Sequence, residues 1–239
     1  AFTCGDVDLK VTFTAPLFME DLKLLSRPVN YLTYSVAARD GREHEVEVYF
    51  EASPRWALDQ PYQQSASKGY EADGLLYLKS GSKEQNILAK QGDDLRIDWG
   101  YFYMVAGKEN TAYSVGNSTE LRKNFVNGTL NSASLEGEDS NGNMALVRSH
   151  GKVKNVTDKI MLGYDDIYSI QYFGTNLRPY WNSKGDRTIE AEMLAAYNEY
   201  DKLLARCYAF DKKLMEDASA AGGKEYAELC ALAYRQSIA

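Results

Sequence analysis

The hydrophobic pattern of this chain changes its period once, near residue 186. In the front part, apolar residues alternate with polar ones, as they do from Val7 to Phe13, and a period of two is typical of a strand with one buried face. In the back part, apolar residues recur at three- and four-residue steps from Ile189 to Leu214, which is the pattern of an amphipathic helix. Strands first and helices afterwards favour an α+β fold over a βαβ sheet.

Turn residues divide the front part into short strands. Asp40-Gly41 separates two alternating runs, 29–38 and 43–52, and this dipeptide suits the positive φ angles of a two-residue turn. We therefore expect the two runs to pair as a hairpin. Several short strands joined by such turns indicate an antiparallel β-sandwich. Further strands are expected at 74–78, 95–105 and 144–147, with a long polar loop over 122–143.

Two glycines divide the helical part. Asp186 or Thr188 is a suitable N-terminal cap for a helix that ends near Ala220, and Gly222-Gly223 would stop it. A second helix is expected from Lys224 onward. The apolar stripes of such a hairpin need more partners than one sandwich face supplies, so we expect a C-terminal α-helical hairpin that is the truncated start of a larger helical domain. The inner side of the second helix is expected to contain Tyr226, Leu229, Cys230 and Ala233.

The predicted domain organisation has three parts. Residues 1–161 would form the antiparallel β-sandwich domain, residues 162–185 a junction, and residues 186–239 the helical hairpin. The three cysteines are too few for a disulfide framework. Cys207 and Cys230 fall on apolar helix faces, where buried thiols are expected.

Charge and hydropathy exclude two classes of partner. The net charge is −7 and no cluster of lysine or arginine marks a basic face, so a nucleic-acid partner is not expected. No run approaches the roughly 18 apolar residues of a membrane-spanning helix, and no membrane span is expected. The 18 tyrosines are the unusual feature of the composition, because an amphipathic ring suits half-buried sheet faces and polar clefts equally well.

Candidate binding residues concentrate in the junction. The stretch Leu162–Trp181 is far richer in aromatic residues than the rest of the chain, and it contains two adjacent carboxylates and an arginine. A carboxylate with a raised pKa can act as a general acid or base, and an arginine can bind a carboxylate through two hydrogen bonds. Only one of two adjacent aspartates on a strand can point into a given cleft. The candidate binding residues are Asp165, Asp166, Tyr168, Tyr172, Arg178, Tyr180 and Trp181.

Packing between the two parts of the chain is the alternative interpretation of this stretch. Tyr180 and Trp181, which follow Pro179, are expected to pack between the layers. His44 and His150 are expected to face solvent, and neither neighbours a candidate nucleophile, so no Ser-His-Asp triad is indicated. The sequence therefore assigns no catalytic residue.

No metal site or cofactor is expected. Asp93-Asp94 is interpreted as a turn, because no further ligand stands at a suitable spacing. The segment 139–143 has only a faint likeness to a calcium loop, since its glycine is misplaced and the distal glutamate is missing.

Four stretches together resemble the glutaminase A family, large extracytoplasmic proteins of bacteria and fungi. They are 21–53 (DLKLLSRPVNYLTYSVAARDGREHEVEVYFEAS), 97–104 (IDWGYFYM), 162–181 (LGYDDIYSIQYFGTNLRPYW) and 199–239 (EYDKLLARCYAFDKKLMEDASAAGGKEYAELCALAYRQSIA). The last two are the most specific, because such long joint patterns rarely recur by chance. In that family a β-sandwich region precedes an all-α toroid of six helical hairpins. The resemblance implies that residues 1–239 hold the sandwich and the first hairpin of the toroid.

The resemblance also implies an activity for a parent protein, the hydrolysis of L-glutamine to L-glutamate and ammonia. Similar toroids hold the active site, with loops of the sandwich at its rim, and no catalytic motif of the family matches positions in this chain. The chain is therefore expected to be a non-catalytic scaffold, with the helical toroid of the same protein as its partner. A small-molecule amide would be the substrate of the parent, no cofactor is implied, and the location would be secreted or periplasmic.

A carbohydrate-binding or ancillary module of a glycoside-hydrolase-like protein is the alternative function, because sandwiches joined to helical toroids also occur in sugar enzymes. It predicts a row of exposed aromatic rings on a concave sheet, and burial of these rings would exclude it. A free-standing enzyme is a third alternative, which no assembled nucleophile and base supports. The aromatic candidates for a sugar platform are Tyr31, Tyr49, Tyr101 and Tyr103.

Overall fold

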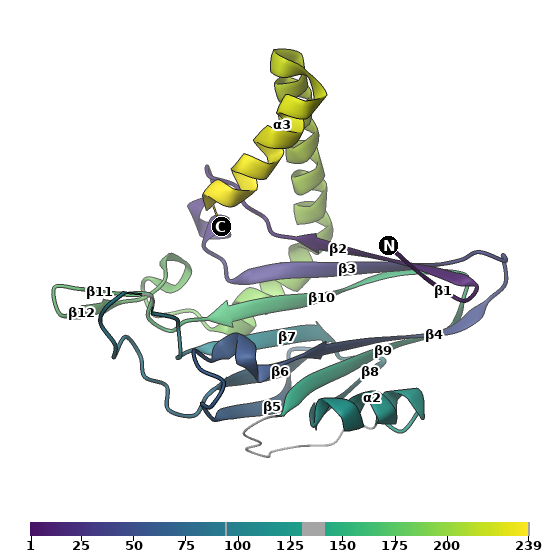
Figure 1. Cartoon of the computed structure of the whole chain (residues 1–239), viewed down its shortest axis with the longest axis horizontal. Helices are drawn as coiled ribbons and strands as arrows, with labels where there is room; N and C mark the ends of the chain where they lie inside the picture. The colour runs from purple at the N-terminus through teal and green to yellow at the C-terminus, as the bar shows by residue number, and fades with distance from the viewer. Residues whose placement is uncertain (94, 131–141, 239) are drawn as a thin grey trace.

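The computed structural model describes residues 1–93, 95–130 and 142–238, which form antiparallel β-sheets and a long C-terminal helical segment (Figure 1). The expectation of a sheet-rich antiparallel front and a helical back is confirmed. The expectations about Asp93-Asp94 and Asp139–Asn143 fall partly outside the described residues.

Within these residues, the larger sheet has seven strands in the order β1-β2-β3-β10-β7-β6-β5, and neighbouring strands are antiparallel. The smaller sheet has the order β4-β9-β8, and β11 pairs with β12 beyond the end of β10. The strands of the larger sheet are β1 (Phe2–Cys4), β2 (Val7–Thr14), β3 (Val29–Ala38), β5 (Ser65–Ala72), β6 (Leu75–Ser82), β7 (Tyr101–Gly107) and β10 (Asn155–Asp165). The remaining strands are β4 (His44–Ala52), β8 (Thr111–Gly116), β9 (Asn143–Val153), β11 (Ile170–Tyr172) and β12 (Thr175–Leu177).

The larger sheet has a hydrophobic core on each face. Side chains alternate along a strand, so Leu78 and Met104 point towards the smaller sheet, where Leu146 completes the interior of the sandwich. Tyr103 and Met161 point the opposite way and pack against the C-terminal helical segment. The first half of the helical segment therefore lies on the outer face of the larger sheet, and the remainder extends beyond β2 (Figure 1).

The helical segment α3 (Ile189–Ile238) is a hairpin rather than a single rod. Gly223 has φ 83° and ψ −176°, which breaks the helix where the glycine pair predicted a stop, and the chain then returns towards the sheet (Figure 1). The Thr188 hydroxyl accepts a hydrogen bond of 3.2 Å from the Ala191 N–H, so Thr188 is the capping residue. The ring centroids of Phe210 and Tyr234, one from each half, lie 5.0 Å apart.

The inner side of the second half of α3 differs from the prediction. Ala227 is fully buried, whereas Tyr226, Leu229 and Ala233 are exposed. The sequence stripe pointed to the larger side chains, but a close approach of two helices favours the small one. Cys207 and Cys230 are free, half-buried thiols.

Asp40-Gly41 does not form the predicted hairpin. Strand β3 already has β2 on one side and β10 on the other, so β4 crosses to the smaller sheet and pairs with β9. The Asp40 carboxylate accepts a hydrogen bond of 2.9 Å from the Arg42 N–H, which closes a local turn at this crossing. A two-residue turn instead joins β5 to β6 at Asp73 and Gly74, whose φ angles are 49° and 78°.

Two further expectations about the front part need correction. Residues 122–126 of the predicted loop are helical, because they form the end of helix α2 (Ser118–Val126), whose first turn is capped by the Asn117 side chain. The strand predicted at 95–105 starts only at Tyr101.

The short helical elements are α1 (Leu22–Leu25), η1 (Pro54–Ala57) and η2 (Tyr180–Asn182). Of the helices in the described parts of the chain, none is long and apolar enough to cross a membrane.

Candidate functional site

Two stretches distant in sequence interlock at one end of the larger sheet, where β6 and β10 end and β7 begins (Figure 1). The indole N–H of Trp99 donates to the carbonyl oxygens of Asp166 at 2.8 Å and Tyr168 at 3.0 Å. The Tyr164 hydroxyl donates in return to the carbonyl of Trp99. The segment before β7 and the segment after β10 are therefore fixed to each other through backbone groups.

Gly100 makes this close approach possible. Its φ is +78°, and a Cβ placed on it would lie 2.3 Å from the carbonyl oxygen of Asp165. The Gln85 side chain holds the same residue from the other side, because it accepts from the Gly100 N–H at 2.8 Å and donates to the Gly100 carbonyl at 3.1 Å. Gly100 thus sets the position of the backbone that carries the two aspartates.

Three half-buried side chains form a cluster on the outer face of this sheet end. Tyr101 lies on β7, with Asp165 of β10 as its direct cross-strand neighbour. Lys79 of β6 places its Nζ 3.5 Å from the centroid of the Tyr101 ring. Behind them, the Tyr70 hydroxyl donates to Glu190 Oε1 at 2.6 Å, which ties β5 to the start of α3.

Burial shifts the pKa of both charged groups in this cluster away from the charged form. Desolvation raises the pKa of the Asp165 carboxyl, although the N–H of Ile167 donates to Asp165 Oδ1 at 3.0 Å and opposes the shift. Desolvation lowers the pKa of the Lys79 ammonium, and the charge of Lys68 adds to this effect. Perturbed pKa values of this kind cluster at functional sites.

Replacing Asp165 by asparagine is expected to raise the free energy of unfolding at neutral pH by roughly 0.5–2 kcal/mol, the common range for a single stabilising substitution. The amide keeps an acceptor for the Ile167 N–H and removes the charge that burial disfavours. Because the folded-state pKa of Asp165 is raised, the ionised carboxylate destabilises the fold only above the unfolded-state pKa, and fully above the folded-state pKa. Urea denaturation over a pH series should show the advantage shrinking on acidification, and a loss of stability at neutral pH would contradict this account.

The other predicted site residues lie around this cluster with different roles. The Asp166 carboxylate accepts from the Ser169 hydroxyl at 2.5 Å, and the Arg178 guanidinium lies 4.9 Å from the centroid of the Tyr168 ring. Trp181 is buried in the core beneath α3, as the packing interpretation expects. Tyr172 and Tyr180 are exposed, so Tyr180 does not pack between the layers. Whether these residues bind a ligand stays a prediction.

Sequence reasoning missed Lys79, because nothing along the chain distinguishes this single lysine, which stands between Leu78 and Ser80 in strand β6. Trp99 and Gly100 lie in the stretch Ile97–Met104, one of those that carry the family resemblance. Nothing in that stretch indicated that these two residues fix the segment after β10.

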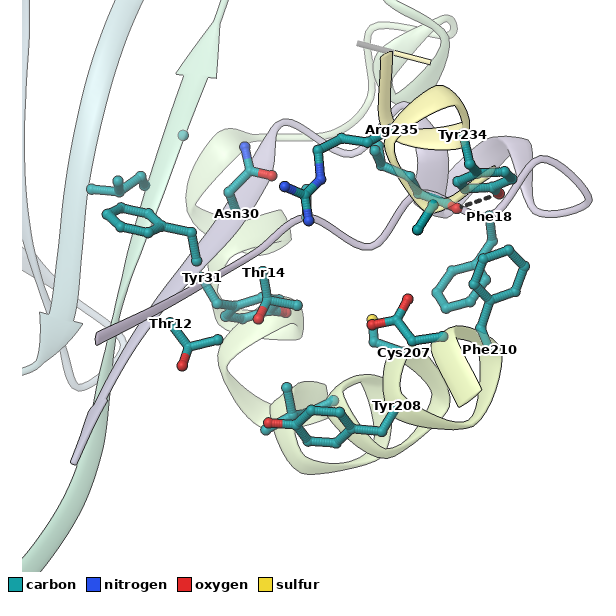
Figure 2. A pocket seen from close by; sticks show the side chains of 18 of the residues that line it. Thr12, Thr14, Phe18, Asn30, Tyr31, Cys207, Tyr208, Phe210, Tyr234 and Arg235 are labelled. Carbon is teal, nitrogen blue, oxygen red and sulfur yellow. Dashed lines mark hydrogen bonds between the residues drawn. The ribbon is translucent and has the colours of Figure 1, made fainter. Parts of the chain in front are cut away.

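A cavity of about 960 Å³ lies between the helical hairpin and the edge of the larger sheet (Figure 2). Its lining includes Tyr31 of β3 and Leu162 of β10, and Cys207 and Tyr234 come from the two halves of α3. Figure 2 shows Arg235 reaching over this cavity, opposite Tyr208. Its walls are largely apolar, and burial raises the pKa of the Cys207 thiol, so it suits an apolar occupant better than acid–base chemistry.

The aromatic row predicted by the carbohydrate alternative is absent from the outer face. Tyr31 and Tyr103 are 2% and 1% exposed, Tyr49 stacks on Phe125, and Lys79 covers Tyr101. The prediction of exposed rings is therefore wrong for the two buried residues, since the helical hairpin occupies the face on which a sugar would lie.

The histidines are also less exposed than expected. His150 is half-buried, with its Nε2 2.7 Å from the Tyr34 hydroxyl, and burial lowers its pKa. His44 forms a hydrogen bond of 2.9 Å with Asp40.

Among the side chains that the structure describes, no three His, Cys, Asp or Glu residues come together in an arrangement that could hold a metal ion.

The sequence matches the family described as "Domain of unknown function (DUF5127)" over residues 1–217. It is also similar to Glutaminase A of Aspergillus oryzae, with 27% identity over an alignment of 253 residues. That alignment covers 98% of this chain and 36% of the relative, so the chain spans little more than a third of the length of the curated relative that it matches. The expected relation to a glutaminase is confirmed at the level of a distant likeness.

Proposed function

We propose that this chain, which belongs to the DUF5127 family, is the non-catalytic scaffold portion of a larger glutaminase-like hydrolase. The parent protein would be secreted or periplasmic and would convert L-glutamine to L-glutamate and ammonia. The observation that carries the proposal is the uneven coverage: almost all of this chain aligns with a protein named Glutaminase A, whereas most of that protein has no counterpart here.

The surface of the helical hairpin supports a scaffold role. The second half of α3 exposes Tyr226, Leu229 and Leu232, and the large cavity opens beside it. Contiguous apolar surface of this kind typically marks an interaction site. We assign this surface to contact with further helices of the same parent protein. In that arrangement, α3 would be the first hairpin of the toroid.

The interlocked sheet end would then lie at the rim of the active site. Lys79, Tyr101 and Asp165 lie beside the start of α3, where Tyr70 is bound to Glu190. The predicted residues Asp166 and Arg178 lie on the segments that follow. A parent active site in the helical part would thus receive side chains from both parts of the protein.

An ammonia-release assay on L-glutamine tests the proposal. We expect no release by the chain of 239 residues, release by a version extended through the complete helical part, and loss of activity or solubility when residues 1–185 are deleted from the extended version. Activity of the chain alone would overturn the scaffold assignment. Silence of the well-folded extended version would overturn the glutaminase assignment.

A further inference from the structure

Strand β2 has a free edge beside the large cavity. One side of β2 pairs with β3 along its whole length, from Val7 to Thr14. On the other side, within the described residues, only β1 pairs with it, and this pairing ends where Phe2 lies opposite Leu9. The stretch Lys10–Thr14 therefore has a strand partner on one side only. An unpaired stretch of this kind is a template for a further strand.

Val11 and Phe13 direct their backbone N–H and C=O groups to this free edge. The pair Cys4 and Val7 closes the two-residue turn of the β1–β2 hairpin, and such a closing pair is hydrogen-bonded. Because the direction of the backbone groups alternates along a strand, the odd-numbered residues of β2 face the side of β1. The Asp6 carbonyl points the other way, where it accepts from the Arg39 N–H at 2.8 Å.

The large cavity lies where the next strand would run, since neighbouring strands are roughly 4.8 Å apart. Figure 2 shows Thr12 and Thr14 on one side of this cavity, and Cys207 and Tyr208 of α3 on the other. Phe13 also lines the cavity and is 74% exposed. A strand at this edge would therefore be covered by α3 and would itself cover Phe13. None of the exposed apolar residues assigned above to further helices lines this cavity.

We propose that the segment of the parent protein that leads into Ala1 continues β1 along the free edge of β2 and fills the cavity as an additional antiparallel strand. Because β1 is antiparallel to β2 and Phe2 lies opposite Leu9, each residue further upstream would fall opposite the next residue of β2. The inference rests on the chain being part of a longer parent, as proposed above, and not on the reaction of that parent.

The existing β1–β2 pairing favours this occupant over a separate molecule. A segment joined to β1 is already held at the edge, so its pairing is intramolecular and has a high effective concentration. A free peptide or a second copy of the chain would lose translational and rotational freedom on binding. The register is also fixed in advance by the β1–β2 turn.

This register defines the side chains that the segment should present. Thr12 pairs with Thr33, whose hydroxyl oxygen lies 2.6 Å from that of Tyr200 in α3. Residues directly opposite each other point to the same face, so upstream residues opposite Thr12 and Thr14 would point to α3. The wall there is largely apolar and includes Leu204. We therefore expect apolar side chains at these two upstream positions.

Hydrogen–deuterium exchange at single-residue resolution tests the proposal. Three versions are compared: the chain alone, the chain with the parent's residues ahead of Ala1, and the chain extended only downstream through the helical part. In the upstream version, we expect the Val11 and Phe13 amides to exchange at least about a hundredfold more slowly than in the chain alone, because a new hydrogen bond must open first. The downstream version should leave both amides as fast as in the chain alone.

Each other result assigns the edge differently. Fast exchange of both amides in a folded upstream version would overturn the proposal. Protection in the downstream version alone would assign the edge to a later segment, and protection that grows with the concentration of the chain alone would assign it to a second copy; both would overturn the proposal. Ammonia release is read separately in the downstream version, so a failure of the glutaminase assignment would leave the exchange result intact.

A pair of proline variants tests the direction of the backbone groups. Phe13→Pro removes the N–H that faces the free edge, which an edge strand tolerates, so the chain alone should keep its melting temperature. In the upstream version, the same variant should reduce the protection of the Val11 amide at least tenfold. Thr12→Pro is the matched control, because it removes an N–H that faces β3 and should lower the melting temperature of the chain alone by at least about 4 °C. Equal losses for the two variants in the chain alone would overturn the free edge and the proposal with it.

Discussion

Replacing Gly100 by alanine is expected to destabilise the protein by about 3 kcal/mol, from roughly 1–2 kcal/mol of backbone strain at positive φ and a similar cost for overpacking. Gly100 has φ +78°, and an added Cβ would lie 2.3 Å from the carbonyl oxygen of Asp165 and 2.9 Å from the Cα of Asp166. Both obstacles are backbone atoms, which cannot rotate away as the end of a side chain can. Relief therefore requires the segments before β7 and after β10 to separate.

Gly74 is the control for this substitution, because it has the same φ of +78° and nothing within 4 Å of an added Cβ. Gly74→Ala should cost only roughly 1–2 kcal/mol, the backbone strain alone. Urea denaturation of both variants measures the difference, and tryptophan fluorescence should report the release of Trp99 in Gly100→Ala. Equal losses in the two variants would contradict the role assigned to the close approach.

The two Asp-Gly pairs show how far turn chemistry predicts a sheet. Asp73-Gly74 joins β5 and β6 in a two-residue hairpin, whereas Asp40-Gly41 lies in a crossing from one sheet to the other. The local sequence is the same in both, so the outcome depends on whether the preceding strand has a free edge. Strand β3 has none, because β2 and β10 occupy both edges, and that pairing joins residues distant in the sequence.

The helical part was more predictable than the sheets, since periodicity and glycine position are local signals. Thr188 and Gly223 mark the start and the break of α3 as the sequence indicated. The face of the second half was predicted less well, because Ala227 rather than Leu229 lies against the rest of the protein. Which residues are buried there depends on the space between two helices. The hydrophobic pattern of one helix carries no information about that space.

The candidate site was predictable only in part. The density of aromatic and charged residues marked Asp165 within its stretch, and the same stretch proved to be anchored by Trp99. Lys79 and Tyr101 reach the cluster only through the order of β6, β7 and β10 in the sheet. Neither residue type nor spacing along the chain encodes that order.

The junction between sheet and hairpin depends on Glu192, and replacing it by glutamine is expected to destabilise the protein by about 3–5 kcal/mol. The Glu192 side chain is only 3% exposed, and its Oε2 lies 3.1 Å from Nε of Arg27. Arg187 forms a second ion pair with Glu192. Loss of the carboxylate charge would deprive Arg187 of this ion pair and leave Arg27 paired only with the exposed Glu199, and removing a buried partner costs more than breaking an exposed pair.

Glu199 is the matched control, because it binds the same Arg27 at 2.9 Å with a side chain that is 49% exposed. Glu199→Gln should cost no more than about 1 kcal/mol, as expected for a pair open to solvent. Denaturant unfolding of both variants decides between burial and simple pairing as the source of stability. If the two variants lost the same free energy, pairing with Arg27 would be sufficient, and Glu192 could not be the residue that anchors α3 to the segment before β3. A larger loss for Glu192→Gln would instead identify the buried carboxylate as the link through which the hairpin holds its position over the sheet.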